Sequence, residues 1–222
     1  MRVATNKIEK FKGDLVKHKS QDIQSETEER IFPSHYMSML CLNEKREKIV
    51  MPVRYLMRPH DKDETFDSKF NGCYNARLDS LDSVRWWKDG LGRRHGIILV
   101  KKFYENVDPA DYAKKFKIPK GSEDKKSMVL CFEPDNVEYM FIPMIWDVWT
   151  KKGEPDLYSA ALITDEPEPE IAAAGHDRTP IFLKESAIDD WLNATETTVK
   201  GLERVLSQRE HPGYSHRVVG AA

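Results

Sequence analysis

The segment Tyr139–Thr164 reads YMFIPMIWDVWTKKGEPDLYSAALIT, and it contains two apolar runs separated by a short polar stretch. The runs, Tyr139–Trp149 and Tyr158–Thr164, are rich in aromatic and β-branched residues, which favour strands. The polar stretch Lys151–Pro155 contains a glycine and a proline, which indicate a turn. A short turn joins antiparallel strands, because a parallel connection needs a much longer crossover. The segment therefore predicts an antiparallel strand pair.

Strand and helix patterns follow one another irregularly along the rest of the chain, unlike the regular alternation of a parallel βαβ sheet. We therefore predict an α+β fold, with a single domain over residues 1–222 built on a curved, mostly antiparallel, barrel-like mixed sheet flanked by helices. Further strands are predicted at Tyr36–Leu42, Ile49–Met57, His95–Glu105 and Met128–Phe132, helices at Asn6–Lys19, Leu81–Lys88, Pro109–Phe116, Glu185–Leu192 and Thr195–Gln208, a long loop at Arg58–Asn71 and a frayed tail at His211–Ala222.

Composition limits the classes of function. The formal net charge of the 222 residues is -2, so a nucleic-acid surface must be a local patch. Three widely spaced cysteines indicate a reducing, cytoplasmic compartment and argue against a zinc site. The seven histidines show no metal-ligand spacing, so we expect neither a metal nor a cofactor. No apolar stretch approaches the length of a membrane span, so no membrane partner is expected.

The segment Gly175–Pro180, GHDRTP, places a histidine, an acid and an arginine between a small-residue run and an apolar run. Its terminal glycine and proline predict a rigid connection, and such loops often carry functional residues. Asn75 and Glu105 also lie at the ends of apolar segments. A buried carboxyl suits acid–base chemistry, a histidine as a residue type titrates near neutrality, and an asparagine amide both donates and accepts. The alternative is that all three are solvated ends of secondary structure.

Short motifs occur at Pro52–Pro59 (PVRYLMRP), Tyr74–Arg77 (YNAR), Phe103–Glu105 (FYE), Ile145–Trp149 (IWDVW), Leu162–Thr164 (LIT) ahead of GHDRTP, and Ser215–Val219 (SHRVV). In this order they resemble the WGLIP, NAR, GFYEW, GLWExW, T…HDRMP and HPVSxxV motifs of the SOS-response-associated peptidase (SRAP) family, which processes abasic sites. The resemblance runs from about Ile31 to Leu192, and it is weakest in the last motif.

The resemblance implies a protein of the SOS and DNA-damage response that binds single-stranded DNA containing abasic sites. Such a protein reacts with the ring-opened deoxyribose aldehyde. Glu105 would be the acid and base, His176 would polarise or protonate the opened sugar, and Asn75 would orient the attacking group. Arg77 and Arg178 match positions that hold the DNA backbone, where a guanidinium suits phosphate.

Tyr55 stands where the family motif has a tryptophan, near the tip of the predicted hairpin. It would supply base stacking to the DNA. The alternative is that Tyr55 is an ordinary core aromatic residue.

The second residue departs from the family, whose nucleophile is a cysteine exposed after removal of the initiator methionine. This chain has Arg2, and none of its cysteines lies at the N-terminus. Three interpretations stay open. The true start differs, a divergent and phage-related member binds DNA without crosslinking, or the α-amine of Met1, with an ordinary pKa of about 8, forms a Schiff base and acts as a lyase.

A peptidase or other hydrolase, as the family name suggests, has the least support. The chain shows no nucleophile elbow with a Ser-His-Asp order and no N-terminal cysteine. We expect a monomer that acts in the cytoplasm, associated with the nucleoid.

Overall fold

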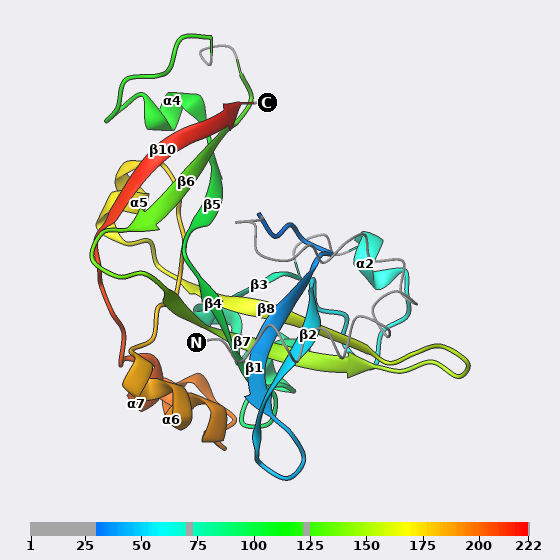
Figure 1. Cartoon of the computed structure of the whole chain (residues 1–222). Helices are drawn as coiled ribbons and strands as arrows, with labels where there is room; N and C mark the ends of the chain where they lie inside the picture. Colours follow the sequence, from blue (N-terminus) through cyan, green and yellow to red (C-terminus); the bar gives the residue numbers. More distant parts are fainter. Residues whose placement is uncertain (1–29, 70–72, 122–124, 222) are drawn as a thin grey trace.

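The computed structural model describes residues 30–69, 73–121 and 125–221, which form a closed barrel and a smaller second sheet (Figure 1). The strands of the larger sheet are β1 (Tyr36–Leu42), β2 (Lys48–Tyr55), β3 (Asn75–Arg77), β4 (His95–Val100), β7 (Met140–Trp149), β8 (Leu157–Asp165) and β9 (Thr179–Pro180). The order β2-β1-β4-β7-β8 closes into a ring because β2 pairs again with β8. β3 and β9 also pair with β8.

The strand pairings confirm a mixed, mostly antiparallel sheet of the α+β class. β7 and β8 pair antiparallel, as the segment Tyr139–Thr164 predicts, with Trp146 opposite Ala160. Only β2 and β3 run parallel to β8 among the described strands. β2 pairs with β8 at Ala160 and β3 pairs with it from Leu162 onward. β8 therefore brings together β2 and β3, two of the strands that contribute to the candidate site.

The second sheet contains β5 (Phe103–Val107), β6 (Met128–Pro134) and β10 (Tyr214–Ala221), in the order β10-β6-β5. The prediction of one strand over His95–Glu105 was wrong. The chain leaves the barrel at Lys101–Lys102 and β5 joins the other sheet, because an exposed lysine ammonium interrupts the buried apolar run. The predicted frayed tail was also wrong, since β10 pairs antiparallel with β6 and buries Tyr214.

The described helices are short, and two begin with a proline in the first turn, where no amide hydrogen is needed. Of the predicted helix over Leu81–Lys88 only the last turn, Arg85–Lys88, is α-helical, and a 3-10 helix over Leu78–Ser80 precedes the predicted range. The predicted helix over Asn6–Lys19 lies outside the described residues. The helices are α2 (Phe66–Lys69), η1 (Leu78–Ser80), α3 (Arg85–Lys88), α4 (Pro109–Tyr112), α5 (Pro169–Ala173), η2 (Glu185–Ala187), α6 (Ile188–Asn193) and α7 (Val199–Leu206).

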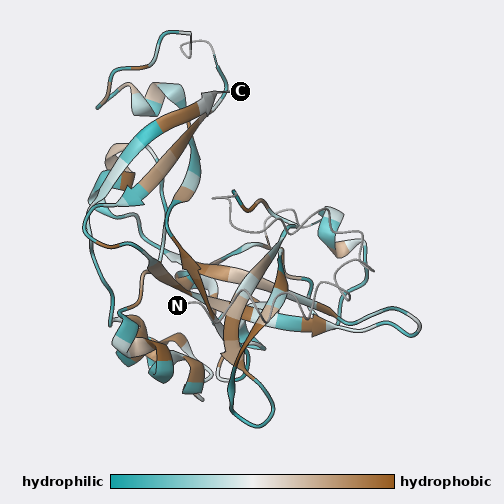
Figure 2. Cartoon of the chain, in the orientation of Figure 1, coloured by the Kyte–Doolittle hydropathy of each residue, from teal (hydrophilic) through white to brown (hydrophobic). Residues whose placement is uncertain are grey.

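Two apolar cores occupy different sides of the barrel. One lies between the barrel and the pair α6 and α7, where the Trp191 ring stacks on His95 with 3.9 Å between ring centroids. The other joins the barrel to the second sheet through residues such as Met39 and Phe132. In Figure 2 the strands are largely hydrophobic and the outer helices alternate in hydropathy. None of the described helices is long and apolar enough to cross a membrane. The assignment of residues 1–222 to a single domain stays a prediction.

Candidate active site

His176 lies directly after the C-terminal end of α5, where backbone hydrogen bonds fix the chain. The amide of Gly175 donates to the carbonyl of Ala172 at 3.1 Å, and the amide of His176 donates to that of Ile171 at 3.2 Å. This is a Schellman cap, and it needs a residue with positive φ; Gly175 has φ +95°. A Cβ atom on Gly175 would lie 3.0 Å from the Cβ of Asp111 in α4. The His176 turn is therefore packed closely on α4.

Because α4 directly follows β5, this packing brings His176 to Glu105. Nε2 of His176 lies 3.1 Å from Oε2 of Glu105, and the two side chains are 20% and 16% exposed. On the other side of the ring, Nδ1 lies 3.0 Å from the carbonyl oxygen of Arg178. The imidazole is therefore held from both sides, with Nε2 directed at the carboxyl group.

Burial raises the pKa of Glu105 to about 7, from an ordinary value of 4.5. The charge of His176 opposes this rise, and that of Asp177 adds to it. At neutral pH the carboxyl group is thus divided between its protonated and ionised forms, so it can both give and take a proton. This is the electrostatic property expected of an acid–base residue.

Asn75 and Tyr55 meet at the edge of β8. The hydroxyl of Tyr55 donates to Oδ1 of Asn75 at 2.9 Å. Burial raises the pKa of Tyr55, and the charge of Glu105 raises it further, so the Tyr55 hydroxyl lies within electrostatic range of that carboxyl group. Tyr55 and Asn75 are thus in direct contact, as are Glu105 and His176, and the effect of Glu105 on Tyr55 indicates that the two pairs lie near each other.

Arg77 and Arg178 come together on Asp79. Arg77 binds both carboxylate oxygens of Asp79, at 3.1 and 2.5 Å, and Nη2 of Arg178 lies 3.6 Å from the same group. Arg178 also binds Glu166, at 2.8 Å. Nε of Arg178 and Oγ1 of Thr164 are buried and make no hydrogen bond with the described residues. Two guanidinium groups and two unpaired polar atoms thus lie around the end of β8, where Thr164 pairs with Arg77.

The role of Asp79 at the rim of the site was not predicted from the sequence. Its carboxylate binds Arg77, inside η1. A signal was present, because an acid two residues after an arginine on an exposed turn often pairs with it. The contact with Arg178 had no sequence signal, since it depends on how β3 and β9 flank β8.

The cysteines are buried, and none of them lies among these side chains. Burial raises the pKa of Cys41 and of Cys73 to about 11, and it also raises the pKa of Cys131. A thiol with such a pKa is protonated at neutral pH and is a poor nucleophile. Arg2 and the N-terminal amine lie outside the described residues.

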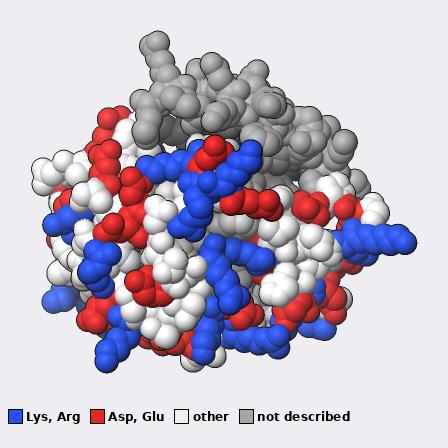
Figure 3. All heavy atoms as spheres, turned by 90° about the horizontal axis from the view of Figure 1, so that it is seen from below, with Lys and Arg blue, Asp and Glu red and all other residues white. Residues whose placement is uncertain are grey.

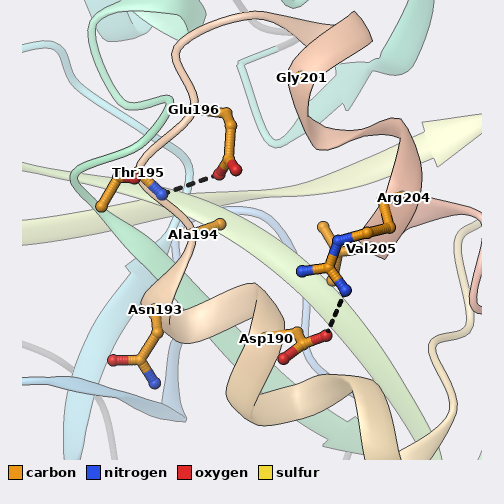
Figure 4. Close-up of a pocket in the computed structure, with 8 residues that line it drawn as sticks. All are labelled: Asp190, Asn193, Ala194, Thr195, Glu196, Gly201, Arg204 and Val205. Atoms are coloured by element: carbon orange, nitrogen blue, oxygen red, sulfur yellow. Dashed lines mark hydrogen bonds and ion pairs between the residues drawn. The ribbon is translucent and has the colours of Figure 1, made fainter.

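Two other parts of the surface differ from this site. The hollow between α6 and α7, of about 170 Å³, contains an Arg204–Asp190 ion pair of 3.0 Å and lies at the opposite end of the molecule from β5 and α5 (Figures 1 and 4). Figure 3 shows acidic and basic side chains intermixed on the face seen from below, without a field of one sign. Among residues 30–69, 73–121 and 125–221, no group of three or more His, Cys, Asp or Glu side chains is arranged to hold a metal ion.

Comparison with known proteins assigns the family. Residues 2–221 match the family model described as SOS response associated peptidase (SRAP). The chain belongs to the SRAP family. It is 29% identical, over 154 residues, to the abasic site processing protein YoaM of Bacillus subtilis strain 168. That match covers 68% of this chain and 59% of YoaM, so the chain matches about three fifths of the length of that SRAP relative.

Solved structures share the SRAP fold at low sequence identity. A crystal structure of a protein from Bordetella bronchiseptica superposes with a TM-score of 0.64 at 16% identity, covering 86% of each chain. One from Bacteroides thetaiotaomicron gives 0.63 at 13% identity, covering 84% of this chain and 75% of the other. A phage-related protein from Bordetella bronchiseptica gives 0.58 at 17% identity, covering 85% and 80%. These likenesses confirm the fold. At such low identity they do not indicate the chemistry.

Proposed function

We propose that this SRAP protein binds single-stranded DNA and processes abasic sites in it, by reacting with the ring-opened deoxyribose. The observation that carries the proposal is the partly buried Glu105–His176 pair, with 3.1 Å between Oε2 and Nε2 and with the pKa of Glu105 raised to about 7. The name of the YoaM relative, an abasic site processing protein, supports the same chemistry.

The pair is suited to opening the sugar ring. The 1′-hydroxyl loses its proton to one member, O4′ gains a proton, and the C1′–O4′ bond breaks as the C1′ carbonyl forms. Proton transfer of this kind needs groups that titrate near the working pH, which the raised pKa of Glu105 provides. An amine then adds to C1′, and loss of one water leaves an imine. The α-amine of the chain is the amine that we assign to this step, and Asn75 orients it and the sugar.

Arg77 and Arg178 would hold the phosphates that flank the abasic sugar. Their guanidinium groups lie on one carboxylate at the rim of the site, and Nε of Arg178 makes no hydrogen bond with the described residues. A phosphate oxygen is a suitable acceptor for that buried donor. Base stacking by Tyr55 stays a prediction, as does action as a monomer in the cytoplasm.

The test is to incubate the full chain with an abasic single-stranded oligonucleotide, add borohydride and separate the products on a denaturing gel. We expect a trapped adduct that Glu105→Gln and His176→Ala weaken by tenfold or more, on the order of the usual contribution of acid–base groups. Glu133→Gln is the matched control, because its side chain lies on β6, outside the site, and is about half exposed. No adduct with the unaltered chain would refute the covalent step.

A second candidate is a DNA-binding protein without the covalent step. Arg2 in place of the family's cysteine and the burial of all three cysteines favour it. It predicts binding that weakens with salt and is lost when Arg77 and Arg178 are both replaced by alanine, with no trapped adduct. The gel and a salt titration of binding therefore separate the two candidates.

A further inference from the structure

Tyr55 is held rigidly at the end of β2. Its amide donates to the carbonyl of His35 at 2.8 Å, and its carbonyl accepts from the amide of Ser34 at 2.7 Å. Its ring makes a T-shaped contact with that of Tyr74, with 5.7 Å between centroids and 73° between planes. Backbone and ring are both fixed, so the position of the Tyr55 hydroxyl is set by the barrel rather than by rotation of a free side chain.

Tyr55 and Asn75 point to the same side of the sheet. Tyr55 pairs with Ala160 of β8, and Asn75 pairs with Leu162 on the same strand. Positions two residues apart along a strand share a face. This register is what brings the Tyr55 hydroxyl to within 2.9 Å of Oδ1 of Asn75. The contact thus follows from the parallel pairing of β2 and β3 with β8.

We propose that Tyr55 is a positioning residue, whose hydroxyl fixes the side-chain amide of Asn75 so that its NH₂ group faces the abasic sugar as a donor. The proposal rests on the proposed function. An asparagine amide can turn over and exchange its oxygen for its nitrogen. In the structure the phenol donates to Oδ1, which leaves the NH₂ group free to donate elsewhere. The free donor is then directed at the oxygen that becomes the C1′ carbonyl.

The burial and pKa of Tyr55 agree with this role. Because its pKa is raised, the phenol stays protonated throughout the pH range in which Glu105 titrates, and it remains a donor. A base-stacking residue needs an exposed ring face, whereas Tyr55 is half-buried and packs against Tyr74. The two roles predict different behaviour when only the hydroxyl is removed, because stacking needs the ring and positioning needs the oxygen.

The first arm of the test measures adduct formation with Tyr55→Phe, Asn75→Ala and the double variant, under saturating protein. We expect Tyr55→Phe to slow the reaction about tenfold, since a small misplacement of a catalytic group costs up to about a hundredfold. Its affinity for single-stranded DNA should stay within about twofold of the unaltered chain, as for a neutral hydroxyl that contacts no phosphate. Asn75→Ala should slow the reaction further, and the double variant should match Asn75→Ala, because residues that act through one another are not additive.

Tyr158→Phe is the matched control, because it removes a hydroxyl from the same barrel at a position on β8 outside the site. It should react at the rate of the unaltered chain. Effects of Tyr55→Phe and Asn75→Ala that multiply in the double variant would overturn the proposal. So would a loss of DNA affinity with Tyr55→Phe, which would mean that the hydroxyl itself binds the DNA. A reaction rate of Tyr55→Phe equal to that of the unaltered chain would instead favour base stacking.

The second arm is independent of activity. In NMR spectra of the chain labelled with ¹⁵N, the side-chain NH₂ signals of Asn75 should be sharp and distinct, and they should shift and broaden in Tyr55→Phe but not in Tyr158→Phe. Unchanged Asn75 signals would overturn the positioning role. If the unaltered chain forms no adduct, the proposed covalent function fails, while the NMR arm still decides the role of Tyr55.

Discussion

The replacement Glu105→Gln should stabilise the fold increasingly as pH rises, because it removes an ionisable group from a buried position. The pKa of Glu105 is 4.5 in its ordinary state and about 7 in the folded chain. A carboxyl whose folded pKa is raised binds its proton more tightly when folded. Below pH 4.5 the group is protonated in both the folded and the unfolded chain, so it costs no stability. As pH rises from 4.5 through 7 the unfolded chain loses this proton first, and the fold loses stability.

The size of the effect follows from the shift. One pKa unit corresponds to about 1.4 kcal/mol, so ionising Glu105 costs the fold about 3 kcal/mol at pH 8 and less than about 1 kcal/mol at pH 5. Solvent screening reduces this cost only slightly, because the side chain of Glu105 is 16% exposed. A glutamine side chain has nearly the same shape without the charge, so the variant should gain most of this free energy at the higher pH and little at the lower.

The assay is urea unfolding of both chains at pH 5, 6, 7 and 8 and constant ionic strength, with the free energy of unfolding extrapolated to water. Glu133→Gln, on an exposed position of β6, should differ from the unaltered chain by less than about 1 kcal/mol at every pH. A constant difference between Glu105→Gln and the unaltered chain across this range would refute the reasoning. It would mean that Glu105 ionises as readily in the fold as in the unfolded chain.

Three further predictions concern the turn, the core and the rim of the site. Gly175→Ala should lose about 1–3 kcal/mol in unfolding free energy, because an alanine at φ +95° is strained and its Cβ would lie 3.0 Å from Asp111. The control is Gly153→Ala, which is also at positive φ but has no atom within 4 Å of its Cβ, and it should lose less. The pKa of His95 is lowered to about 4, mainly by burial, so its neutral form is the one that folds, and stability should fall by about 3 kcal/mol as pH drops from 6.5 to 4. This loss, measured by urea unfolding, should be absent in His95→Gln. Asp79→Asn removes a negative charge from beside two guanidinium groups, of which Arg178 keeps its ion pair with Glu166. It should tighten single-stranded DNA binding about two- to fivefold at low salt, measured by fluorescence anisotropy. Weaker binding would mean that Asp79 is needed to place the two arginines.

The barrel was predictable because each of its strands is a distinct apolar run. Tyr139–Thr164 predicts β7, its turn and β8, and the structure confirms them. The stretch His95–Glu105 misled because two apolar runs separated only by Lys101 and Lys102 do not tell which sheet each run joins. The tail was misjudged for a related reason, since β10 is stabilised by pairing with β6, far away in sequence.

The residues of the candidate site were predictable individually, and their contacts were not. Motif order singled out Asn75, Glu105 and His176, and the 3.1 Å contact between the last two depends on how α5 ends against α4. The hydrogen bond from Tyr55 to Asn75 depends on the shared edge of β8, which no local pattern encodes. The contacts that form the candidate site thus depend on tertiary structure rather than on the local sequence around each residue.

The central claim is that this chain forms a covalent bond with an abasic sugar, with Glu105 moving the proton. The most direct measurement is the intact mass of the chain after reaction with an abasic single-stranded oligonucleotide and borohydride, followed by mapping of the modified peptide. We predict a product with the summed mass of the two molecules, less one water and plus two hydrogens, attached at the N-terminal peptide and greatly reduced in Glu105→Gln. A chain whose mass is unchanged, or an adduct whose yield does not depend on Glu105, would contradict the account.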